Sequence, residues 1–71
     1  MYIVTQNRKS VVNLGNMWGI AVGKGEIFAR PSYKEIIVLG IYDEERTGEI
    51  FKMILDAISL DRGSVIYMPE K

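Results

Sequence analysis

The spacing of the apolar residues changes once along this chain, after Tyr42, and this change constrains the fold more than any other feature. Before it, short segments rich in β-branched and aromatic residues alternate with polar breaks, which is typical of strands. After it, apolar residues recur at every third or fourth position, which is typical of one amphipathic helix. The helical set is Ile50, Phe51, Ile54, Ala57 and Ile58. The sequence therefore predicts an α+β fold with a single helix.

Polar or glycine-containing turns separate five strand-like segments, which are residues 2–5, 10–14, 17–22, 26–30 and 35–41. We expect them to form an antiparallel meander of about five strands. The amphipathic helix follows the meander, and a short C-terminal strand over residues 64–68 follows the helix. The chain contains no internal repeat, so residues 1–71 are expected to form a single small domain.

The expected helix has recognisable ends. Asp43 is a favourable N-cap, and Glu44 and Glu45 lie in the first turn, where the helix dipole favours negative charge. Gly63 suits the C′ position after the last helical turn. Gly48 is unusual because glycine inside a helix costs about 1 kcal/mol relative to alanine. It is explained either by tolerance near the first turn or by close contact of the backbone with the sheet.

The strand expected over residues 35–41 is apolar on both of its sides. Side chains alternate along a strand, so Ile37, Leu39 and Ile41 are expected on one side. The other side is expected to carry Ile36, Val38, Gly40 and Tyr42. One helix can cover only one face of a sheet. Either the sheet curls into a small half-barrel, or a second copy of the chain covers the other face, with two-fold pairing as the default.

We favour a homo-oligomer, a dimer or higher, because a chain of 71 residues buries only about 60% of the surface that its unfolded form exposes. Chains of this size usually need a disulfide, a metal or a partner subunit. The candidate oligomer face consists of Ile37, Leu39, Ile41 and Trp18.

The chain has no cysteine and no histidine. Disulfides and the common zinc sites are therefore excluded, and the usual general base and activated nucleophile are missing. The carboxylates at the start of the helix are explained by capping and by the helix dipole. We therefore expect a protein that is not an enzyme and that has no cofactor, no metal site and no catalytic residues.

The tripeptide Gly23-Lys24-Gly25 suggests a phosphate-binding loop, but it lacks the Ser or Thr and the following helix that such loops need. A tight hairpin turn, with glycine at positive φ, explains the same residues. The sequence therefore predicts a turn that places Lys24 in solvent.

The net charge is zero, with nine basic and nine acidic residues. Residues 1–42 carry five basic and two acidic residues, a net +3, and residues 43–71 carry four basic and seven acidic residues, a net −3. Within the basic half, a candidate anion or nucleic-acid rim consists of Lys24, Arg30, Lys34, Tyr33 and Trp18. Cations beside exposed aromatic rings suit single-stranded nucleic acid, whereas scattered cations also serve solubility alone.

Residues 45–56 of the helix place acidic side chains near one another, a face that either docks a basic partner or is simply solvated. No apolar run reaches the roughly 20 residues needed to span a bilayer. The first nine residues do not have the charge order of a signal peptide. We therefore expect a cytoplasmic protein without membrane contact.

Three stretches have a distinctive character: the opening MYIVTQNRKSVVNL, the segment VLGIYDEER before an Ile-rich helix, and the ending VIYMPEK. Together they resemble short uncharacterised phage and prophage proteins of Gram-positive bacteria. The resemblance implies an accessory protein that acts in the bacterial host by binding a host protein or a small ligand. We thus expect a non-enzymatic oligomeric binding protein, and the alternative is a single-stranded nucleic-acid-binding protein that uses a basic, aromatic sheet face.

Overall fold

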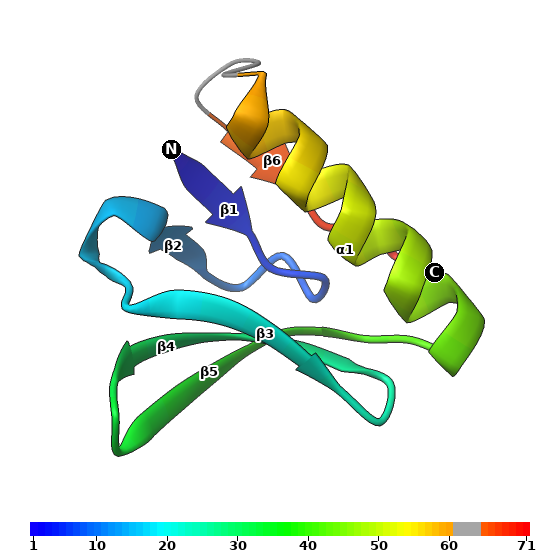
Figure 1. Ribbon diagram of the computed structural model, residues 1–71, viewed down its shortest axis with the longest axis horizontal. Helices are drawn as coiled ribbons and strands as arrows, with labels where there is room; N and C mark the ends of the chain where they lie inside the picture. Colours follow the sequence, from blue (N-terminus) through cyan, green and yellow to red (C-terminus); the bar gives the residue numbers. More distant parts are fainter. Residues whose placement is uncertain (61–64) are drawn as a thin grey trace.

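The computed structural model describes residues 1–60 and 65–71, and these residues form the α+β fold that the sequence predicts (Figure 1). The strands and helices follow one another as β1 (Tyr2–Val4), β2 (Val11–Asn13), the 3₁₀ turn η1 (Leu14–Asn16), β3 (Gly19–Gly23), β4 (Glu26–Ser32), β5 (Glu35–Ile41), α1 (Glu44–Ser59) and β6 (Val65–Tyr67). Within the described residues, no helix has the length and apolar character needed to cross a bilayer.

The strands form two three-stranded sheets. The antiparallel meander is β3-β4-β5, and the second sheet has the order β2-β1-β6. In the second sheet β1 pairs antiparallel with β2 and parallel with β6, so the two ends of the chain lie side by side. The C-terminal strand is therefore the third strand of a sheet that the first hairpin begins.

The inner faces of the two sheets and one side of α1 enclose a single core. Strand β4 contributes Ile27 and Ala29, and α1 contributes Ile50 and Ile54 at helical spacing. The buried apolar residues as a whole are Ile3, Val12, Ile27, Ala29, Leu39, Tyr42, Ile50, Ile54, Ile66 and Met68. The outer face of β3-β4-β5 points away from α1 (Figure 1).

The start of α1 is confirmed in detail, because the Asp43 carboxylate accepts a hydrogen bond of 2.8 Å from the Arg46 backbone N–H. The predicted helix C′ residue Gly63 and the predicted strand start at Ser64 lie outside the described residues. A Cβ atom added to Gly48 would meet nothing within 4 Å. Close contact between this glycine and the sheet is therefore excluded, and tolerance on an exposed helix surface explains it.

A β-bulge in β5 changes which side chains share a face. Ile27 pairs with Gly40, and the next residue, Phe28, pairs with Val38, so that Leu39 is an extra residue in β5. Leu39 faces inward like Ile37, as alternation predicts, and is buried in the core, whereas the extra residue turns Ile41 to the outer face, where it is 61% exposed.

The predicted oligomer face is therefore wrong as a single surface. Ile37 packs against the core and Leu39 is fully buried within it, whereas Ile41 lies on the opposite face of the sheet. Trp18 is exposed, but it precedes β3 and contacts Tyr33 in the turn after β4. The alternation rule failed here because it assumes an unbroken strand.

The loop between β1 and β2 holds the two sheets together through Gln6. The Gln6 backbone N–H donates to Leu39 O at 2.9 Å. Its side chain accepts from the Ile41 N–H at 2.8 Å and donates to Ile41 O at 3.1 Å and to Glu70 O at 3.0 Å. A single amide side chain thus joins the edge of β5 to the C-terminal segment.

Candidate functional site

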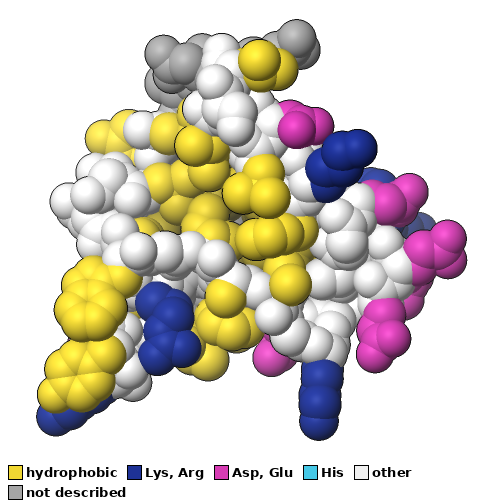
Figure 2. Space-filling view, viewed as in Figure 1, with side chains coloured by type: hydrophobic (Ala, Val, Ile, Leu, Met, Phe, Trp, Pro, Cys, Tyr) yellow, Lys and Arg dark blue, Asp and Glu magenta, His cyan; other side chains and the backbone are white. Residues whose placement is uncertain are grey.

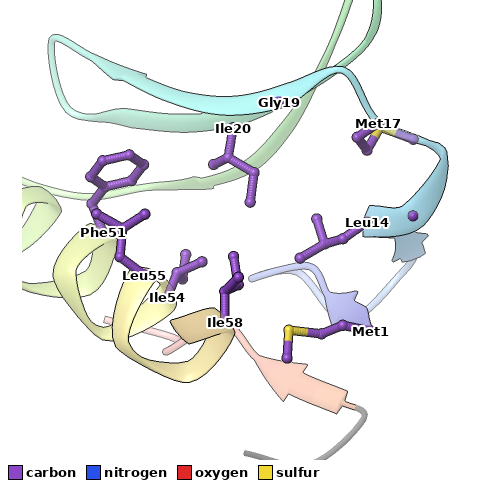
Figure 3. Close-up of a pocket in the computed structure, with 10 residues that line it drawn as sticks. Met1, Leu14, Met17, Gly19, Ile20, Phe51, Ile54, Leu55 and Ile58 are labelled. Atoms are coloured by element: carbon purple, nitrogen blue, oxygen red, sulfur yellow. The ribbon is translucent and has the colours of Figure 1, made fainter. Parts of the chain in front are cut away.

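An apolar groove of about 460 Å³ opens between α1 on one side and Met1, η1 and β3 on the other (Figure 3). In Figure 3 the Ile20 side chain points from β3 toward α1, and Leu14 and Met1 close the far side. The lining residues are Met1, Leu14, Gly15, Met17, Gly19, Ile20, Phe51, Ile54, Leu55 and Ile58. The space-filling view shows apolar side chains gathered around this hollow (Figure 2).

Local structure explains how these side chains reach the groove. Ile20 lies opposite Ala29 in the β3–β4 pairing and therefore shares the inner face of the sheet. The Leu14 backbone N–H donates to Met1 O at 2.9 Å, which fixes η1 beside the start of β1. On α1, Leu55 and Ile58 lie one turn apart at the edge of the buried stripe, and they remain 47% and 44% exposed.

The chemistry available in the groove is limited to apolar contact. Among the described residues, those that line it have apolar side chains or are glycines, so the groove offers no ionisable side chain. Removing apolar surface from water yields about 25 cal/mol per Å², and exposed apolar concavities commonly mark sites of interaction.

The opposite side of α1 carries the predicted acidic helix face. A hollow of about 570 Å³ there is lined by Glu49, Lys52, Met53, Asp56, Ala57 and Leu60. Glu49 forms an ion pair of 3.5 Å with Arg46, and both side chains are largely exposed. Surface pairs of this kind contribute about 0–1 kcal/mol.

A second candidate site, here called the aromatic tip, consists of Trp18, Arg30, Tyr33 and Lys34 at the β4–β5 turn. The ring centroids of Trp18 and Tyr33 lie 6.0 Å apart, and these side chains are 69% and 64% exposed. The Lys34 ammonium lies 5.5 Å from the Tyr33 ring centroid, and an Arg30 guanidinium nitrogen donates to Tyr33 O at 2.8 Å. The structure thus brings together four of the five residues of the predicted basic rim.

Lys24 does not belong to that group. It lies in the two-residue turn between β3 and β4, with φ of 45° at Lys24 and 84° at Gly25, which confirms the predicted hairpin turn. Gly19 pairs with Arg30 at one end of β3, whereas Gly23 pairs with Glu26 at the other end. Four residues of strand, about 13 Å, therefore separate the two ends, and the prediction of one continuous five-residue rim is wrong.

Arg8, another cation of the basic half, is engaged in holding the chain ends together. Its guanidinium donates to Met68 O at 2.6 Å and to Thr5 O at 3.3 Å. It also lies 5.7 Å from the Tyr67 ring centroid. These contacts give Arg8 a structural role in the β2-β1-β6 sheet.

Sequence reasoning did not identify the groove, because its walls come from segments far apart in the chain. One signal pointed toward it: Met53 and Leu55 extend the apolar stripe of α1 beyond what contact with one sheet face requires. Of the two, Leu55 lines the groove, whereas Met53 lies on the opposite side of α1. Within the described residues, no group of three acidic side chains could hold a metal ion. Comparison of the chain with protein-family models, curated proteins and solved structures finds no match, so the proposals below depend on the geometry of these sites.

Proposed function

We propose that this chain is a non-enzymatic binding protein that self-associates and that binds apolar side chains of a partner protein in the groove between α1 and β3. The observation that supports this proposal most directly is the groove of about 460 Å³, in which every lining side chain is apolar. Its volume lies within the range of about 300–1,000 Å³ that is common for binding pockets. The resemblance to short phage and prophage proteins supports a bacterial host protein as the partner.

The composition of the groove favours a protein over a polar small molecule. Small-molecule sites combine an apolar lining with a few polar groups that fix the orientation of the ligand. The groove supplies no polar side chain for this purpose. An apolar segment of a partner protein needs no such groups, because its backbone N–H and C=O groups can bond to one another. Its side chains would lie between Ile20 on one side of the groove and Leu55 and Ile58 on the other.

The proposal is tested by affinity capture from the natural host with two matched variants. Leu55→Asp places a charge in the groove, and Met53→Asp places the same charge on the opposite side of α1. The two parent side chains are similarly exposed, at 47% and 40%. Proteins retained by the wild type and by Met53→Asp, but lost with Leu55→Asp, would be groove partners. Equal retention by all three proteins would refute the groove as the binding site.

The aromatic tip supports a second candidate function, the binding of single-stranded nucleic acid. Exposed aromatic rings stack on bases, and neighbouring cations contact phosphates. Trp18 and Tyr33 offer two adjoining rings with Arg30 and Lys34 beside them. If this function is correct, affinity for an oligonucleotide falls steeply with salt and is lost in a Trp18→Ala, Tyr33→Ala double variant. No binding at low salt would dismiss it.

A further inference from the structure

The outer face of the β3-β4-β5 sheet is an apolar surface without a cover within the described residues. On β5, Ile36, Val38 and Ile41 are 54%, 40% and 61% exposed. On β4, Ile27 and Ala29 are buried, so the alternating residues Glu26, Phe28 and Arg30 face outward. Because Phe28 on the central strand and the exposed Ile36, Val38 and Ile41 on the edge strand β5 supply much of this face, its exposure to water is unfavourable.

On β3 and β5 the outward residues on the two sides of the centre are alike, whereas on β4 they carry opposite charges. On β4 an acid, an aromatic residue and a base follow one another as Glu26, Phe28 and Arg30. On β3 the corresponding outward residues are Gly23, Ala21 and Gly19, which pair with these three across the sheet. On β5, Ile41 lies opposite Glu26 and Val38 lies opposite Phe28, with Ile36 beyond.

We propose that a second copy of this chain stacks on this face, related by a two-fold axis that lies between the two sheets, perpendicular to β4, at Phe28. This axis reverses the strand direction, so each Glu26 faces the Arg30 of the other copy and two ion pairs form. Phe28 faces Phe28, Val38 faces Val38, and Ile41 faces Ile36. Packed sheets lie about 10 Å apart with strands inclined by about 30°, a separation that Glu and Arg side chains can bridge.

Charge selects this arrangement over the other simple two-fold stacking. An axis parallel to β4 would place Glu26 against Glu26 and Arg30 against Arg30, and such like-charge contacts are unfavourable. The Arg30 guanidinium is already oriented by its hydrogen bond to Tyr33 O, and its remaining N–H groups can still meet a carboxylate. The face is therefore complementary to itself in one orientation.

Stacking on this face is compatible with the groove. The groove opens on the inner side of β3, toward α1, whereas the proposed dimer uses the outer side of the same sheet. Each copy would thus keep its own groove accessible. The interface specifies the self-association in the proposed function and depends on that part of it, while the identity of the groove partner is independent of it.

Charge reversal tests the interface, with sedimentation equilibrium from micromolar to near-millimolar concentration as the assay. Glu26→Arg and Arg30→Glu each create like-charge contacts, so each should raise the dimer dissociation constant at least about tenfold. The double variant Glu26→Arg/Arg30→Glu exchanges the charges and should dimerise nearly as well as the wild type. Lys52→Glu, on the outer side of α1, makes the same change of charge as Arg30→Glu and should have no effect.

A mixture of the two single variants gives the sharpest result. The Glu26→Arg chain carries two bases on its β4 face and the Arg30→Glu chain carries two acids, so a heterodimer has opposite charges at both contacts. Equimolar mixing should therefore restore dimers that neither variant forms alone, which also shows that both variants are folded.

The outcomes separate the interface from the proposed function. A wild-type chain that sediments at 8.1 kDa throughout would overturn both the interface and the self-association in the proposed function. A wild-type oligomer that both single reversals leave unchanged, or single-variant chains that do not associate on mixing, would overturn this interface alone.

Discussion

The Gln6 side chain offers the most direct test of how the two sheets are held together. It forms three hydrogen bonds, which reach the N–H and C=O of Ile41 and the C=O of Glu70. Each contributes roughly 1 kcal/mol net, but the partners can bind water once the side chain is removed. We therefore expect Gln6→Ala to lower the free energy of unfolding by about 2 kcal/mol, which corresponds to a decrease in Tm of roughly 10 °C for a domain of this size.

Two further substitutions separate hydrogen bonding from packing. Gln6→Met keeps a side chain of similar length without polar donors, and we expect a loss close to that of alanine. Gln6→Glu keeps the acceptor for the Ile41 N–H, but at neutral pH its carboxylate faces the two carbonyl oxygens that the amide group contacts. At pH 7 Gln6→Glu should therefore destabilise the protein at least as much as Gln6→Ala does. This destabilisation should shrink when the new carboxyl group is protonated, below about pH 4.

Urea unfolding followed by circular dichroism measures these differences, and Lys9→Ala serves as the control because Lys9 lies exposed in the same loop. A Gln6→Ala variant within about 0.5 kcal/mol of the wild type would refute the view that this amide joins the sheets, since surface substitutions commonly fall within that range. Equal destabilisation by Lys9→Ala would show that the loop as a whole, and not the Gln6 side chain, is responsible.

Three further predictions concern single positions. Gly48→Ala should stabilise the protein by about 1 kcal/mol in urea unfolding, because an added methyl group meets nothing within 4 Å and alanine favours the helix; a destabilised variant would contradict this. Gly40→Ala should lower the free energy of unfolding by about 2 kcal/mol, because the new Cβ would lie 2.6 Å from a Tyr42 ring carbon. The ring cannot move away, since the Tyr42 hydroxyl donates to Pro69 O at 2.5 Å, and a variant of wild-type stability would disprove that the ring is fixed. Burial raises the pKa of Tyr42 above its ordinary value, although the nearby Arg46 and Arg8 charges oppose this shift. As the pH rises through about 10, the Tyr42 hydroxyl therefore loses its proton in the unfolded chain before it does so in the folded one, and the free energy of unfolding should fall. Tyr42→Phe should flatten this fall in a series of urea titrations at different pH values, and an unchanged slope would refute the assignment to Tyr42.

The sequence alone identified the features that depend on neighbouring residues. The N-cap at Asp43, the helical spacing of Ile50 and Ile54 and the turn at Lys24-Gly25 follow from local preferences, and all three are present in the structure. The α+β class also follows, because the spacing of apolar residues changes from strand-like to helical once, after Tyr42, and each spacing can be recognised within its own segment. The proximity of Arg30, Tyr33 and Lys34 is likewise a consequence of one short turn.

Tertiary structure decided which of these local elements meet. The first hairpin pairs with the C-terminal strand, so β1 contacts residues more than 60 positions away, and no local pattern encodes that contact. The bulge at Leu39 depends on how β5 pairs with β4, and this single extra residue turns Ile41 to the outer face, away from Ile37 and Leu39. A one-residue change of register reverses the direction of every later side chain in a strand, and register is set by packing against the partner strand. The groove and the self-complementary outer face are therefore properties of the folded chain, while the residue types that form them were already present in the sequence.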